Sequence, residues 1–176
     1  MMNRNISGPF TKDKLGNLKA GDAVLLSGTV YTARDAAHKR MTEEADAGRP
    51  FPFDLCNAAI YYVGPSPAAP GQVIGSAGPT SSYRMDPYTP RLLDEGLSVI
   101  IGKGPRGPEV IDAIKRNRAI YFAAVGGAGA LISQCIKASE VIAYEEFGTE
   151  AVRRLEIVEM PVIVAVDSAG NSVYER

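Results

Sequence analysis

Short apolar runs alternate with helical segments in the second half of the chain, and this alternation constrains the fold more than any other feature. Residues 97–101 and 119–125 are continuous apolar runs, as expected for strands buried on both faces. Residues 108–117 lie between them and carry apolar side chains on one helical face. The resulting order, β-α-β-α-β, predicts an α/β domain with helices and a mixed sheet packed in layers.

The remaining elements follow from periodicity and from Gly and Pro residues. Thr32 is expected to cap the helix that follows it. Residues 1–20 are interpreted as an N-terminal extension, loose over its first ten residues, and residues 21–176 as one domain. Further strands are expected at 23–32, 57–63, 72–74, 137–144 and 161–166, a strand or turn at 15–20, an element that is helical or extended at 149–158, and helices at 33–47, 87–95 and 130–136.

The composition narrows the classes of partner and compartment. The 176 residues carry a net charge of −1 and no Lys/Arg cluster, so a nucleic-acid partner is not expected. No apolar run reaches the length of a membrane span and no secretory signal is visible, which favours a cytoplasmic protein. Cys56 and Cys135 stand far apart and are interpreted as buried thiols in a reducing compartment. Two cysteines are too few for this chain alone to hold a metal cluster, so no metal ligand is assigned to it.

The loop at residues 75–86 combines two glycines, several hydroxyl side chains and one arginine. Gly75 and Gly78 would let backbone amides approach a ligand, and successive amides can form an anion-binding concavity. Arg84 would add a planar fork that matches a carboxylate. The alternative is an ordinary Gly/Ser turn with a surface arginine.

Four polar side chains stand at expected junctions where a strand meets a loop or helix: Arg34, Thr80, Arg84 and Lys103. The carboxyl ends of strands are where α/β sheets bind ligands. Three cations and a hydroxyl suit a small dicarboxylate, with the hydroxyl relaying a proton. A lone threonine is a poor base and needs a partner carboxylate or a metal-activated substrate. Because this chain shows no obvious metal site, the electrophile would have to come from another chain.

Two of these residues, and the neighbouring His38, also have a simpler interpretation. Arg34 is expected in the first turn of a helix, where a cation is unfavourable, and it could instead pair with Asp35 or Glu43 on the surface. Lys103 stands between two glycines and could belong to a solvated turn. His38, one helical turn after Arg34, is more often a structural residue than a catalyst.

A nucleotide site is the rival hypothesis. Gly127, Ala128 and Gly129 follow an expected strand, and the acidic pair Glu145–Glu146 lies further on. The dinucleotide fingerprint requires a third glycine where Ile132 stands, and a second β-α-β unit is missing. Glycines that let a helix pack closely on the sheet are the favoured explanation.

Several motifs in one order give the chain a family resemblance. It resembles the β subunit, or equivalently the C-terminal domain, of the class I iron–sulfur fumarate hydratases and the related tartrate dehydratases. The motifs run from near residue 21 to near the C-terminus: 28–38 (GTVYTARDAAH), 78–86 (GPTSSYRMD), 101–104 (IGKG), 121–128 (YFAAVGGA), 143–151 (AYEEFGTEA) and 160–167 (MPVIVAVD).

The resemblance implies a swivelling β/β/α domain that closes on an α subunit, in a hetero-oligomer or, for the chain alone, a homodimer. In the family the α subunit carries a [4Fe–4S] cluster on three cysteines, and one iron acts as a Lewis acid in the reversible hydration of fumarate to malate. Thr80 matches the catalytic threonine. Arg34 and Arg84 match the carboxylate-binding arginines, and Lys103 matches the lysine at the substrate. The chain would then be active only with its α subunit.

One departure from the family pattern concerns the substrate. Ser81, Ser82 and Tyr83 stand where the family usually has threonine, a small residue and glycine before the arginine. The bulk of Tyr83 could narrow the site or change which dicarboxylate fits. The alternatives to fumarate hydratase are therefore an L-tartrate dehydratase β subunit, or a stand-alone dicarboxylate-binding or regulatory module of the same fold.

Overall fold

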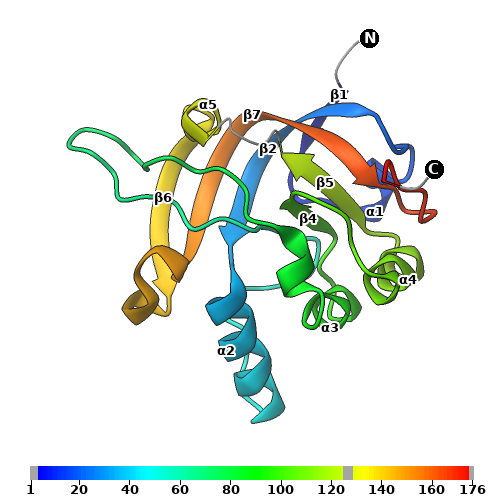
Figure 1. The fold of residues 1–176 in the computed structure, drawn as a ribbon, viewed down its shortest axis with the longest axis horizontal. Coiled ribbons are helices and arrows are strands. Elements are labelled where there is room, and N and C mark those ends of the chain that lie inside the picture. The colour runs from blue at the N-terminus through cyan, green and yellow to red at the C-terminus, as the bar shows by residue number, and fades with distance from the viewer. Residues whose placement is uncertain (1–3, 125–128, 175–176) are drawn as a thin grey trace.

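The computed structural model describes residues 4–124 and 129–174, and within them seven strands form one mixed sheet (Figure 1). The strands are β1 (Arg4–Ser7), β2 (Ala23–Thr32), β3 (Ala59–Tyr61), β4 (Val99–Gly102), β5 (Ile120–Ala124), β6 (Ile136–Ala143) and β7 (Val152–Val166). The helices are α1 (Lys12–Leu15), α2 (Asp35–Asp46), α3 (Thr89–Asp94), α4 (Pro108–Asn117) and α5 (Gly129–Ser133), with 3₁₀ helices η1 (Ser82–Met85) and η2 (Glu145–Glu150). The predicted α/β class with a mixed sheet is confirmed.

The sheet closes on itself. Its order is β1-β2-β3-β4-β5-β7-β6, and β2 also pairs with β7. The pairs from β1 to β5 are parallel, whereas β7 runs antiparallel to β2, β5 and β6. Strands β2, β3, β4, β5 and β7 therefore form a ring, and β1 and β6 lie outside it.

Two apolar clusters explain why the central strands are hydrophobic without interruption. Tyr61, Ile101 and Phe122 belong to the cluster inside the ring. Their neighbours Ile60 and Ile100 belong to a second cluster, which includes buried side chains of α2, α3 and α4. Successive side chains of a strand point to opposite faces, and here both faces are covered.

The N-terminal residues differ from the prediction of a loose segment. Residues Arg4–Ser7 form β1, which pairs in parallel with the first half of β2. Phe10 is buried in the ring's core together with Leu15 and Leu18. Residues Lys12–Leu15 form the short helix α1, and turns at residues 16–17 and 20–21 follow it, in agreement with the turn alternative predicted for residues 15–20. Burial of these apolar side chains stabilises the packing of the segment against the ring. The local sequence pattern gives only a weak indication of the strand.

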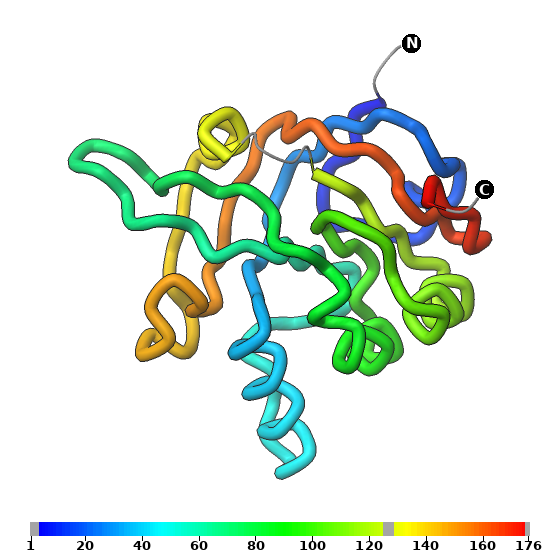
Figure 2. Tube along the Cα trace, in the orientation of Figure 1, coloured from blue at the N-terminus to red at the C-terminus, as the bar shows by residue number. Residues whose placement is uncertain are grey.

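The segment from Gly64 to Thr80 is an irregular excursion that passes over β7 and β6 and returns (Figure 2). The strand predicted at Gln72–Ile74 does not form, since the Gln72 amide instead donates to the Ala69 carbonyl in a turn. The three prolines before it supply no amide hydrogen for a ladder.

Two further boundaries differ from the prediction. Arg34, not Thr32, is the N-cap of α2, because the Thr32 hydroxyl donates to the Ala151 carbonyl and accepts from the Arg153 amide. The segment expected at 149–158 as helical or extended contains both: Thr149 and Glu150 end η2, and β7 begins at Val152. β7 continues through the strand expected at 161–166, because β2 pairs along most of its length. No described helix is both long enough and apolar enough to cross a membrane.

Candidate functional site

The carboxyl ends of three parallel strands meet at one edge of the ring. Strands β2, β3 and β4 lie side by side, with Tyr31 opposite Ile60 and Ile60 opposite Ile100. Arg34 follows β2 by two residues, and Lys103 follows β4 directly. Thr80 and Arg84 follow β3 after the excursion. All four predicted residues therefore come from segments that leave this edge.

Short contacts connect the segments that carry these residues. The Thr80 amide donates to the Tyr62 carbonyl at 2.8 Å, just past the end of β3. Ser81 forms a parallel bridge with Lys103, and the Ser82 amide donates to the Lys103 carbonyl at 2.9 Å. Arg84 in turn reaches Asp35, the residue after Arg34. The structure thus brings the four residues into one connected region.

Arg34 is held at the start of α2 without a carboxylate partner among the described residues. As N-cap it has an extended backbone, with φ −115° and ψ −161°. Its Nε is buried and has no hydrogen-bond acceptor in the described part of the chain. A Cβ at Gly64 would lie 2.8 Å from one terminal nitrogen of Arg34, so a side chain at this position would displace the arginine from its present position. The alternative of a surface pair with Asp35 or Glu43 is not supported within 4 Å in the described residues.

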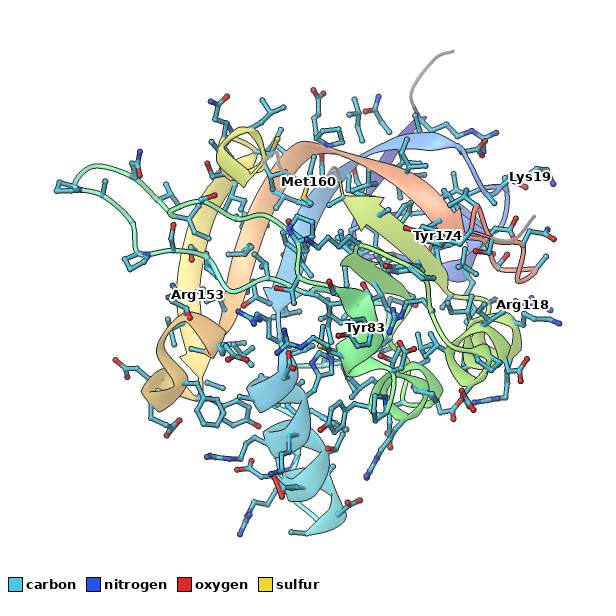
Figure 3. All side chains as sticks on the ribbon, in the orientation of Figure 1. Lys19, Tyr83, Arg118, Arg153, Met160 and Tyr174 are labelled. Carbon is cyan, nitrogen blue, oxygen red and sulfur yellow. The ribbon has the colours of Figure 1, made fainter. Side chains whose placement is uncertain are left out.

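The other three predicted residues are accessible at the same edge. Arg84 and Lys103 are exposed, and Thr80 is half-buried. Arg84 Nε donates a hydrogen bond to Asp35 Oδ2 at 2.8 Å, and one terminal nitrogen forms an ion pair with the same oxygen at 2.8 Å. Tyr83, beside Arg84 on η1, is 66% exposed and available to a ligand or a partner (Figure 3). A dicarboxylate could therefore reach cations and a hydroxyl from the solvent side.

Several backbone amides of the 75–86 loop, where an anion-binding concavity was predicted, are engaged within the protein. The Ser76 amide donates to Ser66 Oγ, the Ala77 amide to the Gly129 carbonyl, and the Thr80 amide to the Tyr62 carbonyl. A Cβ at Gly75 would lie 2.2 Å from the Ser66 carbonyl oxygen. The glycine and these amides hold the excursion together, so the charge at this edge comes from side chains.

His38 has a structural environment, as the simpler interpretation predicts. Its side chain is fully buried, and Nδ1 lies 2.8 Å from the Arg34 carbonyl oxygen. Burial lowers the pKa of His38 from 6.5 to about 4, and the bond to the Arg34 carbonyl only partly opposes this shift. The neutral ring therefore supports the backbone of Arg34 at neutral pH.

Several polar residues that support this edge were not predicted as site residues from the sequence. Asp35 binds Arg84, and the Tyr121 hydroxyl lies 2.7 Å from Ser82 Oγ. Arg106 is buried and forms an ion pair with Asp86 at 2.8 Å. Asp35 lies inside the motif at residues 28–38, and Arg106 follows the Gly-Lys-Gly turn by two residues. Their closeness to these motifs in the sequence suggests a role at the site, but their contacts depend on the order of the strands.

The described residues offer no ligand set for a metal cluster. Among residues 4–124 and 129–174, no group of three or more His, Cys, Asp or Glu side chains is arranged to hold a metal ion. Cys56 and Cys135 are free. The prediction that both thiols are buried is wrong, since Cys56 is exposed and Cys135 is half-buried. Cys56 is exposed because it lies in the irregular segment before β3.

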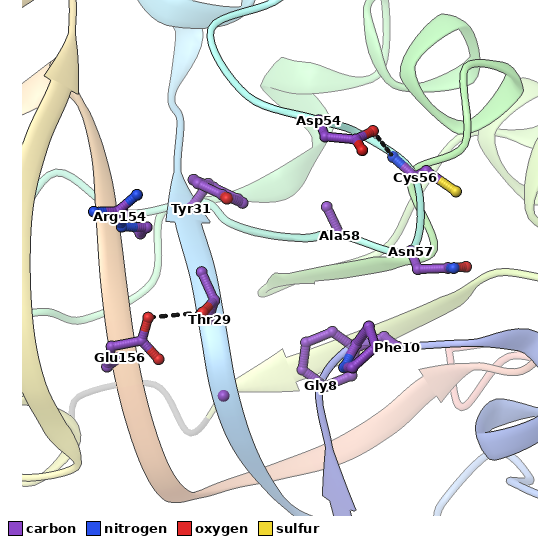
Figure 4. A pocket seen from close by; sticks show the side chains of 12 residues that line it. Gly8, Phe10, Thr29, Tyr31, Asp54, Cys56, Asn57, Ala58, Arg154 and Glu156 are labelled. Carbon is purple, nitrogen blue, oxygen red and sulfur yellow. Dashed lines mark hydrogen bonds between the residues drawn. The ribbon is translucent and has the colours of Figure 1, made fainter.

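A groove of about 660 Å³ lies elsewhere, on the outer side of β2 and β7 (Figure 4). It occurs where β2 changes partner from β1, at Ser27, to β3, at Tyr31. It is lined by Gly8, Pro9, Phe10, Gly28, Thr29, Tyr31, Asp54, Cys56, Asn57, Ala58, Arg154 and Glu156. The four predicted residues are not among them, so this groove is separate from the edge where they lie.

The nucleotide hypothesis loses its structural basis in the described residues. Gly127 and Ala128 lie outside them, but α5 has only five residues. The next strand, β6, pairs with the antiparallel strand β7 and not with β5. A dinucleotide site requires adjacent parallel strands joined by a full helix.

Comparison with known families identifies the chain. The family described as "Fumarase C-terminus" matches residues 2–176. The chain belongs to this family. The resemblance to class I fumarate hydratases and tartrate dehydratase β subunits is thereby confirmed.

Members of the fumarase C-terminus family with curated names include two kinds of protein. Fumarate hydratase 2 of Leishmania major is 36% identical over 94% of this chain and 29% of its own length. The aerobic class I fumarate hydratase of Escherichia coli is 37% identical over 86% of this chain and 28% of its own length. The chain thus spans less than a third of these fumarate hydratases. A putative L(+)-tartrate dehydratase subunit beta of Methanocaldococcus jannaschii is 38% identical over 95% of this chain and 89% of its own length.

Proposed function

We propose that this chain is the β half of an iron–sulfur hydro-lyase that adds water reversibly to fumarate to give malate. The observation that carries the proposal is the convergence of Arg34, Thr80, Arg84 and Lys103 on one edge, in a member of the fumarase C-terminus family. Three cations provide the charge complement of a small dicarboxylate.

Each residue has a distinct role in the proposal. Arg34 and Arg84 bind the substrate carboxylates through their planar guanidinium groups, which can form two parallel hydrogen bonds. Lys103 contributes a mobile positive charge at the same edge. The Thr80 hydroxyl relays the proton at the reacting carbon, and it requires an activated substrate or a neighbouring carboxylate to do so.

The activating group belongs to a partner in this proposal. The described residues hold no ligand set for a cluster, and the printed name "subunit beta" of the archaeal relative supports assembly with an α subunit. A [4Fe–4S] cluster bound there would supply a Lewis acid. Arg84 and Lys103 are exposed at this edge, so such a partner can reach them. We expect the assembly to be a cytoplasmic hetero-oligomer, and the domain to swivel on closure.

L-tartrate is the second candidate substrate. The similarity to the archaeal tartrate dehydratase subunit beta extends over 95% of this chain. Tyr83 lies next to Arg84 and adds a large exposed ring at the edge where a substrate would bind. L-tartrate and fumarate differ in the groups between their carboxylates, so their contacts with the Tyr83 ring would differ.

The test is an anaerobic assay of fumarate, malate and L-tartrate conversion by the chain alone and by the chain co-expressed with a cluster-bearing α subunit. We expect activity only in the complex, and the preferred substrate decides between the two hydro-lyases. Full activity of the isolated chain would refute the proposal. Binding of a dicarboxylate by a chain that remains inactive with the α subunit would support the stand-alone binding module.

A further inference from the structure

Arg106 is a buried guanidinium beneath the candidate site. Its side chain is fully buried, whereas its partner Asp86 is 22% exposed. Nε donates to Asp86 Oδ1 at 2.8 Å, and one terminal nitrogen donates to the Tyr62 hydroxyl at 3.1 Å and to Thr89 Oγ1 at 3.0 Å. A buried charge is costly unless it is paired and hydrogen-bonded, so this arrangement requires an explanation.

Aromatic rings complete the environment of Arg106. Its guanidinium carbon lies 5.2 Å from the centroid of Tyr62 and 4.8 Å from that of Tyr121. Cation–π contacts of this kind strengthen when they are desolvated. Burial alone would lower the pKa of Arg106, but Tyr62, Asp86 and Tyr121 together raise it. The group stays charged, and its position is fixed from several sides.

The partners of Arg106 belong to the segments that carry three of the proposed site residues. Tyr62 accepts the Thr80 amide through its carbonyl oxygen at 2.8 Å. Asp86 ends the η1 helix that carries Arg84, and it also accepts the Gly107 amide at 2.8 Å.

Tyr121 connects the same centre to the lysine turn. Its hydroxyl lies 2.7 Å from Ser82 Oγ and 2.8 Å from the Gly104 carbonyl oxygen. Ser82 Oγ accepts the Lys103 amide at 3.0 Å. The Tyr121 hydroxyl therefore contacts Gly104, which follows Lys103, and Ser82, which accepts the Lys103 amide.

We propose that Arg106 is a positioning residue that fixes Thr80, Arg84 and Lys103 relative to one another through Tyr62, Asp86 and Tyr121. It acts below the substrate and does not contact it. Its consequence for turnover rests on the proposed hydro-lyase function, whereas its consequence for the geometry of the edge does not. Misplacement of reacting groups by about 1 Å can cost about 100-fold in rate, so such a support is of direct catalytic value.

The test compares Arg106→Lys with Arg116→Lys. Lysine keeps the charge but cannot reach Asp86, Tyr62 and Thr89 together. Arg116 is a matched control. It lies on α4, the helix that follows Arg106, and it forms two exposed hydrogen bonds with Asp94. Amide hydrogen exchange of the full chain is followed for Thr80, Ser82 and Lys103, and for β7 as a reference.

We expect Arg106→Lys to speed exchange of those three amides by about tenfold or more, while β7 changes by less than about twofold. Arg116→Lys should leave both regions unchanged. A uniform increase throughout the chain would show a merely structural residue, and unchanged exchange at the three amides would also overturn the proposal. Should Arg106→Lys fail to fold, Tyr121→Phe removes a single hydroxyl and is expected to speed exchange at Ser82 and Lys103; unchanged exchange in that variant overturns the proposal.

Activity of the complex with the α subunit gives the second measurement. We expect kcat/KM to fall by about 10- to 100-fold in Arg106→Lys and by less than about twofold in Arg116→Lys. If the wild-type complex converts neither fumarate nor L-tartrate, the proposed function fails, and the exchange data still decide whether Arg106 positions the edge. If exchange changes locally but the rate of an active complex does not, the catalytic part of the inference is refuted.

Discussion

Arg84 Nε donates a hydrogen bond to Asp35 Oδ2 at 2.8 Å, and a terminal nitrogen of Arg84 forms an ion pair with the same oxygen at 2.8 Å. The other oxygen, Oδ1, is buried without a hydrogen-bond partner among the described residues. Asp35 is the first residue of α2 and directly follows Arg34. The two arginines proposed to bind carboxylates are therefore coupled through one aspartate.

Replacing Asp35 by Asn should weaken this coupling. We expect KM of the complex to rise about three- to tenfold because Arg84 is no longer held by a charged acceptor. The free energy of unfolding should fall by less than about 1 kcal/mol, since both side chains are more than a third exposed. Steady-state kinetics and urea denaturation measure the two effects. Asp46→Asn, which removes the exposed partner of Arg91 at the other end of α2, is the control. An unchanged KM in Asp35→Asn would show that Arg84 does not depend on this pair.

The hydroxyl of Thr80 should matter for turnover more than for binding. In Thr80→Ala we expect kcat of the complex to fall by about 100-fold or more while substrate still binds, because the proton relay is lost and the cations remain. Thr80→Ser keeps a hydroxyl at the same backbone position and should recover most of the rate. Steady-state kinetics with fumarate and L-tartrate measure both variants. Equal rates in the wild type and Thr80→Ala would remove this residue from the mechanism.

Gly102 is required by the close packing of β4 against η1. A Cβ at this position would lie 2.0 Å from Ser82 Oγ and 2.9 Å from Tyr62 Cδ2. We expect Gly102→Ala to lower the free energy of unfolding by about 1–3 kcal/mol, since the surrounding side chains must shift. At Gly78 a Cβ would meet its nearest atom at 3.7 Å, so Gly78→Ala should change stability by less than about 0.5 kcal/mol. Urea denaturation compares the two, and equal effects would contradict the steric argument.

His38 should make stability depend on pH. Its pKa is lowered from 6.5 to about 4, first by burial and also by the Arg106 charge, while the Arg34 carbonyl and Asp35 oppose the shift. The rings of Tyr62 and Tyr88 pack against it. Between pH 6.5 and 4 the unfolded state binds a proton that the folded state does not, so stability falls as the pH decreases. The loss should total on the order of 3 kcal/mol below pH 4.

The measurement is urea denaturation of the full chain at pH 7.5, 6, 5 and 4. The matched variant is His38→Gln, which keeps an amide near the Arg34 carbonyl but does not titrate. All carboxylates remain in both proteins, so the difference between the two pH profiles isolates the histidine. Parallel profiles would contradict the buried, neutral state of His38.

Local pattern alone determined much of the architecture. The alternation of apolar runs and amphipathic segments predicted β2 and α4 at their observed bounds and the α/β class as a whole. It succeeded where burial on two faces leaves a continuous apolar run, as at residues 97–101. It failed at residues 4–10 and 72–74, where tertiary contacts and proline geometry outweigh short-range propensity.

The sequence by itself also selected the four members of the proposed site. Arg34 and Lys103 stand close to the ends of β2 and β4, as predicted, whereas Thr80 and Arg84 follow an irregular segment in place of the predicted strand at 72–74. Only the tertiary structure decided what supports them: the ring closed by β2 and β7, the pair of Asp35 with Arg84, and the centre at Arg106. Arg84 lies 49 residues from Asp35, and Tyr121 lies 39 residues from Ser82. Periodicity reports which face of an element is covered, but contacts at such separations depend on the order and register of the strands.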